Sequence, residues 1–495
     1  MTYRSLDLTE YRAASGLDLG RGVATGTLSP VQLAECALAL IAEHEPVVNA
    51  YAAVLADRAR TEAVARETEA AAGRLRSPLH GVPLAVKDNM LLAGQPTGKG
   101  SLTTSDAPAV DSSPAVQRLL DAGAVVVGTT TTPEFGWKGT GLSPRTGVTR
   151  NPWDPSRGSG GSSAGSAATL ATGAVPLALG SDAGGSIRIP AAFCGVVGLK
   201  PTLGAVPVWP GTVNETLSHA GPLARTVADV RAMLRIVRGP DPRDPQSYYS
   251  RPPAAEVGRR LRVAVVRAPF GIAPLPEVAA VVDPVLAALV GGALEPVASA
   301  EEVDLPAALP RAVFETMWVT GRGLGFRELT HRHGDRMDPG LVRLGPLAEA
   351  YSLADYYAAT TARRDLTATM AAFLSDWDLV VMPTMPLTAF AAEAEVPPDG
   401  RIGEAGAPLP WITWTPYTYP FNITGQPALT LPCGRASDGL PVGLQIVGPW
   451  AHDERVLDLA AACERLLGRT PDSSLAPRPT STSAERRSDQ DGDAW

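Results

Sequence analysis

A stretch of small residues, RGSGGSSAGSAATLATG, fills positions 157–173 of this 495-residue chain. Sequence rich in glycine and serine more often forms a flexible linker than a site. Here the residues that follow Ala167, ATLATGAVPLALG, predict a helix and then a buried strand. The Gly/Ser stretch (157–173) therefore opens a helix inside a folded unit, and its serines become candidates for chemistry.

Helices and strands alternate along the chain, which is typical of α/β proteins. Ser29, Pro30 and Gln32 form a capped helix start. Further helices are expected over 56–72 and 276–290. Strands are expected in GVPLAVKDN, where the strand ends at Lys87, over 124–127, 261–266 and 378–384, and in the segments PALTLP and VGLQIVG. With 45% hydrophobic residues we expect one large domain over 1–470, its motifs between about 80 and 230, and a disordered tail over 471–495.

Charge and apolar patterning argue against several classes of function. The net charge is −8 without a basic cluster, so we do not expect a nucleic-acid binder. The chain shows neither the apolar run of a signal peptide nor the ~18 apolar residues that cross a bilayer, so we expect a cytoplasmic protein with no membrane contact. The cysteines are far apart, which favours buried free thiols over disulfides or a zinc site: Cys36, Cys194, Cys433 and Cys463.

The motif SDAGGSIRIPAAFCGVVGLKPT, which begins at Ser181, contains a glycine turn (residues 183–186) and a second candidate serine. Such a turn places consecutive backbone N–H groups together, and these can hold the oxyanion that forms if Ser186 attacks a carbonyl. An ordinary turn after a strand is the alternative for this motif in isolation. The predicted donors are the N–H groups of Ala183, Gly184, Gly185 and Ser186.

A serine nucleophile needs a base. Of the six histidines only His80 and His219 lie near these motifs, and His331 and His333 are interpreted as surface residues rather than metal ligands. Lysine remains. The chain has only four lysines, and Lys87 follows the apolar residues VPLAV, where burial disfavours the charged form of its amine. A surface or ion-paired lysine is the alternative.

Three motifs together resemble, in their order and spacing, those of the amidase signature family of amide hydrolases. They are GVPLAVKDN, GSGGSSAGSAA and SDAGGSIRIPAAFCGVVGLKPT. The resemblance covers most of the chain, including GPLARTVADV and PFNITGQPALTLPCG. It implies a single α/β domain, with a large mixed, twisted sheet sandwiched between helices, and a Ser-Ser-Lys triad that uses no metal or cofactor. Ala164 stands where the family usually has glycine, which matters only if the backbone there has a positive φ.

The resemblance also implies roles for individual residues. It makes Ser186 the nucleophile, Ser162 the bridging serine after a cis peptide bond, and Lys87 the base. It makes Ser163 a supporting hydrogen-bond partner. Asp182 and Arg188 flank the glycine turn and are expected to fix it rather than react.

Three other interpretations stay open. GSSAG (161–165) matches the nucleophile elbow of α/β-hydrolase esterases, with Ser163 as nucleophile and His452 as its histidine, although an elbow must follow a strand. The amidase subunit of a glutamyl-tRNA amidotransferase usually has an aspartate shortly before P-x-N-x-x-G to hold the glutamine amino group, and Thr415 stands at roughly that place here. A non-catalytic binding protein on the same fold is the third.

Aromatic residues are only 5% of the chain but cluster in VPVWPG, ETMWVTG and PWITWTPYTYP. The cluster predicts an apolar or aryl substrate pocket, with core packing as the equal alternative. The predicted pocket residues are Trp209, Met317, Trp318, Trp414 and Tyr417, with Trp411 and Tyr419 beside them. We therefore expect an amidase for small apolar or aryl amides, with esters and carbamates (urethanes) as further substrates, acting as a monomer or homodimer.

Overall fold

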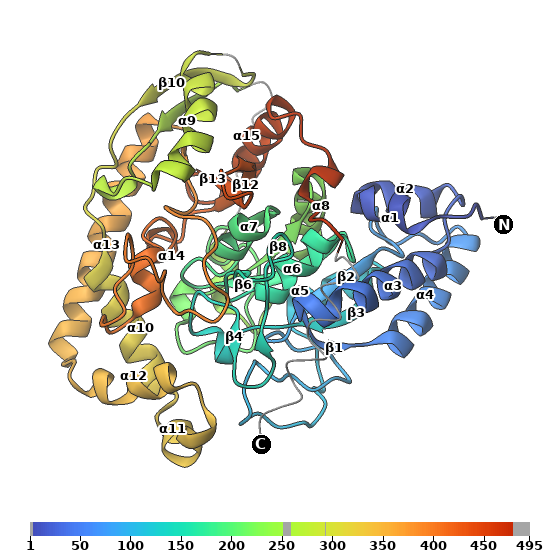
Figure 1. Cartoon of the computed structure of the whole chain (residues 1–495), viewed down its shortest axis with the longest axis horizontal. Coiled ribbons are helices and arrows are strands. Elements are labelled where there is room, and N and C mark those ends of the chain that lie inside the picture. The colour runs from blue at the N-terminus through green and yellow to red at the C-terminus, as the bar shows by residue number, and fades with distance from the viewer. Residues whose placement is uncertain (1–2, 251–258, 293, 479–495) are drawn as a thin grey trace.

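One mixed sheet runs through the molecule (Figure 1). The computed structural model describes residues 3–250, 259–292 and 294–478, and within them the sheet has eleven strands in the order β1-β3-β2-β6-β8-β7-β12-β13-β11-β9-β10. These strands are β1 (Tyr51–Val54), β2 (Pro83–Lys87), β3 (Val125–Thr130), β6 (Leu177–Asp182), β7 (Val197–Lys200), β8 (His219–Ala224), β9 (Leu261–Val265), β10 (Val297–Glu302), β11 (Leu379–Pro383), β12 (Ala428–Arg435) and β13 (Pro441–Val447), with β4 (Leu142–Ser143) and β5 (Gly147–Val148) forming a separate pair. Strands from both halves of the chain share the sheet, which confirms the single α/β domain.

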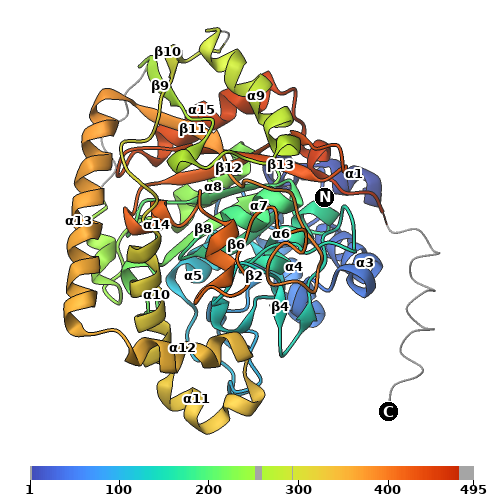
Figure 2. The ribbon, with the colours of Figure 1, turned by 60° about the vertical axis from the view of Figure 1, so that its left-hand side comes forward.

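Helices flank the sheet, with α1–α4 on one side of the molecule and α10–α13 on the opposite side (Figures 1 and 2). The α-helices are α1 (Leu8–Ala13), α2 (Gly16–Ala24), α3 (Pro30–Val48), α4 (Ala56–Ala71), α5 (Pro114–Asp121), α6 (Ala164–Thr172), α7 (Arg188–Cys194), α8 (Val227–Val237), α9 (Pro276–Val290), α10 (Arg311–Gly325), α11 (Arg327–His333), α12 (Pro339–Glu349), α13 (Leu353–Asp376), α14 (Pro420–Ile423) and α15 (Asp453–Leu466). The expected cap is present, because Ser29 accepts a hydrogen bond from the Gln32 N–H at 3.3 Å.

The order of the central strands brings the three sequence motifs together. β2 lies between β3 and β6 and is parallel to both, so β2 and β6 end at the same edge of the sheet. β2 ends at Lys87, and β6 ends at Asp182 immediately before the glycine turn. The Gly/Ser stretch continues into α6, which packs on β6 and β2.

Apolar side chains form one large cluster along the sheet and a second one that is rich in aromatic residues. The second cluster is built from α10, α12 and the segment 385–423, next to α7. All four cysteines are buried and free, as expected. Among the described residues, no helix is both long and apolar enough to span a bilayer.

The predicted start of the C-terminal tail is too early. Pro471–Ser474 form a short 3₁₀ helix (η7), and Ser474 is completely buried. The Ala476 N–H then donates to the Ala171 carbonyl on α6 at 2.9 Å. These contacts place the chain up to residue 478 with the folded domain, and the rest of the predicted tail, 479–495, lies outside the described residues.

Gly165, within the Gly/Ser stretch, allows a close approach of two backbones. A Cβ at this position would lie 1.9 Å from the Ala50 carbonyl oxygen and 2.6 Å from the Thr131 nitrogen. We predict that Gly165→Ala lowers the free energy of unfolding by about 1–3 kcal/mol or more, since the neighbouring atoms belong to backbone that cannot move aside. Chemical denaturation measures the change.

Gly291→Ala provides the matched control. Gly291 is exposed at the end of α9 with a φ of −68°, and its nearest contact for an added Cβ is 3.4 Å. Its substitution should change the free energy of unfolding by no more than about 0.5 kcal/mol. Equal effects of the two variants would contradict the packing argument.

Candidate active site

Lys87 lies at the end of β2 with a completely buried side chain. Its Nζ atom donates to Ser162 Oγ at 2.8 Å, Ser163 Oγ at 3.1 Å and Ser181 Oγ at 3.0 Å. Among the described residues no carboxylate pairs with this amine. Burial lowers the pKa of Lys87 well below its ordinary value, while the more distant charges of Asp182 and Arg322 act in opposite directions. The neutral amine is therefore favoured at this position.

Ser181 and Asn89 belong to this hydrogen-bond group, and neither was predicted from the sequence. Asn89 Nδ2 donates to Ser181 Oγ at 2.8 Å. Both residues stand inside the recognised motifs, in KDN and SDAGGS, so the signal was present. A polar residue next to a candidate base is a reasonable candidate for its hydrogen-bond partner.

The serines of the Gly/Ser stretch lie in a buried loop before α6. The peptide bond between Gly161 and Ser162 is cis, as the resemblance implies. Ser163 Oγ donates to the Ser181 carbonyl at 3.1 Å, and the Ser163 N–H donates to the Ser186 carbonyl at 3.0 Å. Ser163 thus joins the stretch to the glycine turn. Ala164 begins α6 without a positive φ, so the missing glycine imposes no strain.

Ser186 and Ser162 both line a cavity of about 220 Å³. Ser186 is 7% exposed, and its Oγ atom makes no hydrogen bond within the described part of the chain. The structure therefore brings Lys87, Ser162 and Ser163 into direct contact and places Ser186 at the same cavity, without a hydrogen bond between the two serine hydroxyls. The geometry offers a serine hydroxyl without an acceptor among the described residues, at a cavity that Ser162, the partner of the buried amine, also lines.

One of the four predicted oxyanion donors is not free. The Gly185 N–H donates to Asp182 Oδ1 at 2.7 Å, because this carboxylate folds back over the turn that follows it. The N–H groups of Ala183, Gly184 and Ser186 have no acceptor among the described residues. Gly185 has a φ of +126°, which explains why glycine stands there. Of the three residues with an unengaged N–H group, Ala183 and Ser186 line the cavity.

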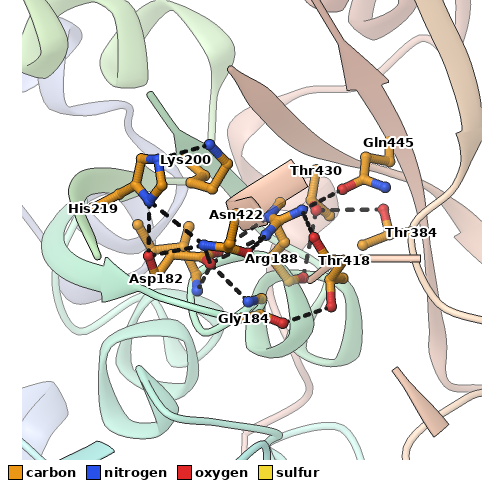
Figure 3. Close-up of polar contacts among 12 residues, drawn as sticks. Asp182, Gly184, Arg188, Lys200, His219, Thr384, Thr418, Asn422, Thr430 and Gln445 are labelled. Atoms are coloured by element: carbon orange, nitrogen blue, oxygen red, sulfur yellow. Dashed lines mark hydrogen bonds and ion pairs between the residues drawn. The ribbon is translucent and has the colours of Figure 1, made fainter. Parts of the chain in front are cut away.

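Asp182 and Arg188 form a completely buried ion pair behind the glycine turn (Figure 3). Arg188 Nε lies 3.0 Å from Asp182 Oδ2, and Arg188 also donates to the Thr418 carbonyl, Gln445 and Asn422. The Ile187 N–H donates to the same carboxylate at 3.1 Å. Burial alone would raise the pKa of Asp182, but the charge and hydrogen bonds of Arg188 outweigh it and hold this pKa well below its ordinary value. The pair is thereby hydrogen-bonded to the turn through the Gly185 and Ile187 N–H groups.

Most of the predicted pocket residues belong to the core. Trp209 lines the cavity, but four others are buried away from it: Met317, Trp318, Trp414 and Tyr417. Their neighbours Trp411 and Phe314 pack against the back of the glycine turn, where a Cβ on Gly184 would lie 2.7 Å from Trp411 and 2.8 Å from Phe314. Trp411 and Phe314 therefore support the turn, and the rest of the aromatic cluster packs in the core outside the cavity lining.

Other side chains, from distant parts of the sequence, form the apolar wall of the cavity. They are Met90, Phe135, Val208, Trp209, Val213 and Phe326. Two cations, Lys99 and Arg322, and the imidazole of His219 also line it. Burial and the neighbouring Lys200 lower the pKa of His219 well below its usual value, so that its ring is neutral. Nowhere in the described ranges do three or more His, Cys, Asp or Glu gather as metal ligands.

A family model for the amidases matches residues 32–457. The chain therefore belongs to the amidase signature family. An acylamidase of Rhodococcus erythropolis is 34% identical over 469 residues, which cover 91% of this chain and 94% of that protein. A glutamyl-tRNA(Gln) amidotransferase subunit of Symbiobacterium thermophilum is 35% identical over 487 residues, covering 91% of this chain and 96% of that protein.

Solved structures agree with this membership. A bacterial aryl acylamidase of the amidase signature family superposes with a TM-score of 0.82 at 26% identity, covering 94% of this chain and 99% of that chain. A 6-aminohexanoate cyclic dimer hydrolase superposes with a TM-score of 0.81 at 28% identity and the same coverage. Family and neighbours together identify the chain as an amide hydrolase.

The esterase interpretation with Ser163 as nucleophile is wrong for this amidase signature protein. Ser163 is completely buried, and its hydroxyl is hydrogen-bonded to the Lys87 amine and the Ser181 carbonyl. The residues before it form a loop, whereas a nucleophile elbow follows a strand. His452 bonds through Nδ1 to the Trp450 carbonyl and does not line the cavity.

We predict that Asp182→Asn lowers the free energy of unfolding by about 3–5 kcal/mol at neutral pH, because Arg188 is left as a buried cation without a carboxylate. Since the pKa of Asp182 is held below its unfolded value of about 3.9, the stabilisation is present above about pH 4 and is lost as the pH falls below it. Denaturation at several pH values measures both effects.

The surface pair of Arg231 and Asp458 serves as the control. These groups lie 2.6 Å apart, but the Asp458 side chain is 58% exposed. Asp458→Asn should cost no more than about 1 kcal/mol. An equally small loss for Asp182→Asn would contradict the structural role of the buried pair.

Proposed function

We propose that this chain hydrolyses the C–N bond of small amides with an apolar or aryl part, through a covalent acyl-enzyme on Ser186. The observation that carries the proposal is the buried Lys87 amine, 2.8 Å from Ser162 Oγ and without a carboxylate partner among the described residues, beside the cavity that Ser186 lines. A neutral amine can accept a proton, whereas a paired ammonium cannot.

In the proposed cycle the amine accepts the hydroxyl proton of Ser162, and Ser162 accepts that of Ser186. The freed Ser186 oxygen forms a bond to the acyl carbon. The negative charge that develops on the carbonyl oxygen faces the free N–H groups of the glycine turn. When the C–N bond breaks, the protons return along the same path to the leaving nitrogen.

Hydrolysis of the acyl-enzyme repeats these steps with water. The relay removes a proton from the water molecule as its oxygen attacks the acyl carbon. The bond between Ser186 Oγ and that carbon then breaks, and the proton returns to Ser186. The hydroxyl of Ser186 must turn toward Ser162 for the first transfer, since the two hydroxyls make no hydrogen bond in this conformation.

The walls of the cavity support small apolar or aryl substrates. Phe135, Trp209 and Phe326 contribute aromatic side chains to the lining, and Val208 and Val213 contribute aliphatic ones. Esters and carbamates (urethanes) present the same acyl carbon to a serine, so they are proposed as further substrates. The names of the acylamidase and aryl acylamidase relatives point to the same class.

The amidotransferase subunit is the second candidate function, because its sequences are as similar to this chain as that of the acylamidase. Glutamine is a zwitterion, so a site that binds it needs a partner for the ammonium group. Thr415, at roughly the place of the expected aspartate, is completely buried and donates to the Trp411 carbonyl at 3.2 Å. This position offers no carboxylate, which favours the hydrolase.

A panel of 4-nitroanilides, 4-nitrophenyl esters, aryl carbamates and L-glutamine tests the proposal. We expect the purified chain to hydrolyse anilides. Both Ser186→Ala and Lys87→Arg should lower kcat by about 10⁴-fold or more. The first variant lacks the attacking oxygen, and in the second the guanidinium keeps its proton and cannot act as a base. Mass spectrometry should show an acyl adduct on Ser186 with a slow ester substrate.

Lys138→Arg is the matched control for Lys87→Arg. Lys138 is also buried, but it pairs with Asp338 and lies outside the cavity lining. Its replacement should leave turnover within about tenfold of the wild type, because charge and pairing are kept. Full activity of Lys87→Arg, or release of ammonia from glutamine only with partner proteins added, would contradict the proposed function.

The pH dependence gives a separate prediction. Because only neutral Lys87 accepts a proton, kcat/KM for a non-ionising anilide should rise with pH through the lowered pKa of Lys87 and then level off. The positive charge of Arg322 also lowers this pKa, so Arg322→Gln should move the rise to higher pH. A rise centred near the ordinary lysine value of about 10.4 in the wild type would contradict a neutral resting amine.

A further inference from the structure

Arg322, on α10, lines the cavity with a side chain that is almost completely buried. Its Nη1 atom donates to the Phe135 carbonyl at 2.7 Å. Its Nε atom is buried without an acceptor, and Nη2 likewise makes no hydrogen bond within the described residues. None of the carboxylates described in the structure pairs with this guanidinium. Arg322 therefore keeps unused donors at the cavity.

The other charged groups around the cavity do not neutralise Arg322. Asp182 is the one carboxylate among the described lining residues, and both its oxygens are engaged by Arg188 and by the glycine turn. Lys99 also lines the cavity and makes no ion pair within the described residues, although the nearby charge of Asp88 raises its pKa against the effect of burial. The cavity thus carries positive charge in excess.

Packing holds the guanidinium of Arg322 in place. Its Cζ atom lies 4.7 Å from the centre of the Trp318 ring and 5.7 Å from that of Phe326. Burial lowers the pKa of Arg322 to about 10, so the group is still charged at neutral pH. A buried cation without a partner is unfavourable in the free protein, and a ligand that supplies the anion removes this penalty.

The matched contrast is the other completely buried arginine outside the turn, Arg225. Its Nη1 and Nη2 atoms donate to the carbonyls of Val175 and Ala14, so its outer nitrogens are satisfied by the protein itself. Arg225 does not line the cavity. The Nε atom of Arg225 is buried without an acceptor, like that of Arg322. Arg322 differs in its Nη2 atom, which makes no hydrogen bond within the described residues, and in its position at the cavity.

We propose that the cavity takes amides that carry a carboxylate, and that Arg322 binds this carboxylate while the apolar wall holds the rest of the substrate. The planar fork of a guanidinium matches the two oxygens of a carboxylate. Amides of dicarboxylic acids and N-acyl amino acids are the chemical class that fits. This inference rests on the proposed function, since it names the substrate class of the same site.

Matched pairs of anilides test the proposal. Succinyl, glutaryl and adipoyl 4-nitroanilides are compared with the corresponding compounds in which a neutral carboxamide replaces the free carboxylate. In the pH range where kcat/KM is constant, the wild type should show a kcat/KM about 10–100-fold higher for the carboxylate compound than for its carboxamide counterpart. This preference is expected for one of the three acyl chain lengths. Arg322→Gln and Arg322→Met should reduce the ratio to about one, and Arg322→Lys should keep part of it.

Arg363→Gln is the control. Arg363, on α13, is partly buried and donates to the carbonyls of Ile423 at 2.8 Å and Thr216 at 2.7 Å, outside the cavity lining. Its loss should leave the ratio unchanged even if stability falls. Equal rates for both members of every pair in the wild type, or a ratio that survives Arg322→Gln, would overturn the proposal.

Binding to an inactive protein separates this proposal from the proposed function. Calorimetry with Ser186→Ala and glutaryl 4-nitroanilide should give binding that weakens about 10–100-fold when Arg322→Gln is added. Binding of this kind supports the carboxylate site even if wild type hydrolyses no anilide. Turnover of neutral anilides without any carboxylate preference overturns the carboxylate site alone. If Arg322→Gln and Arg322→Met do not fold, the proposal is still tested by the carboxylate-to-carboxamide ratio of the wild type and by its partial loss in Arg322→Lys.

Discussion

An amine at the end of β2 lies where water does not reach, and the rest of the site is arranged around it. Lys87 sits between two parallel neighbours, so its side chain leaves the sheet into the interior. Its partners are hydroxyl groups and one carbonyl, which solvate a neutral amine well but offer no negative charge to an ammonium. Because the amine is cut off from water, its hydrogen bonds must come from the protein, so the serine hydroxyls have to lie within hydrogen-bond distance of the Lys87 Nζ atom. Residues without bulk, as in the Gly/Ser stretch, allow that approach.

Two buried arginines near this amine are used in opposite ways. Arg188 is neutralised by Asp182 and surrounded by acceptors, and the pair holds the glycine turn in one conformation. Arg322 has aromatic neighbours and a single carbonyl acceptor. A satisfied cation stabilises the framework, whereas an unsatisfied one makes the free cavity less favourable than the occupied one. The first arrangement fixes the glycine turn, and the second is the basis of the proposed preference for anionic ligands.

Local features of the site could be predicted from the sequence. The strand that ends at Lys87, the helix after the Gly/Ser stretch and the glycine turn all follow from short patterns. The engagement of Gly185 by Asp182 was also predictable, since an aspartate three residues before a turn N–H commonly accepts from it. Burial of Ser474 was not, because the composition of 471–478 resembles a solvated tail and only its packing against α6 shows otherwise.

Features that depend on packing between distant segments could not be predicted. Tryptophan is common in ligand pockets, and nothing in the spacing of Trp318 and Trp414 says whether they contact a ligand or pack in the core, where the structure places them. Phe135, Phe326 and Arg322 come from a loop, a helix end and a helix that the sequence does not connect with the serine motifs. A single arginine in a helix forms no sequence motif. That Arg322 has no carboxylate partner among the described residues can be seen only once the side chains around it are located in the structure.

The charges of the cavity bear directly on the choice between the two classes of relative. An enzyme that takes glutamine must bind an ammonium group and a carboxylate together. Among the described lining residues the one carboxylate is already neutralised by Arg188, whereas Arg322 has no carboxylate partner and Lys99 has only the nearby charge of Asp88. An ammonium group would therefore be repelled by Lys99 and Arg322 without gaining a partner, and a carboxylate would gain one. Because the catalytic motifs are common to both classes, this imbalance of charge around the cavity is what argues for an anionic amide over a zwitterion.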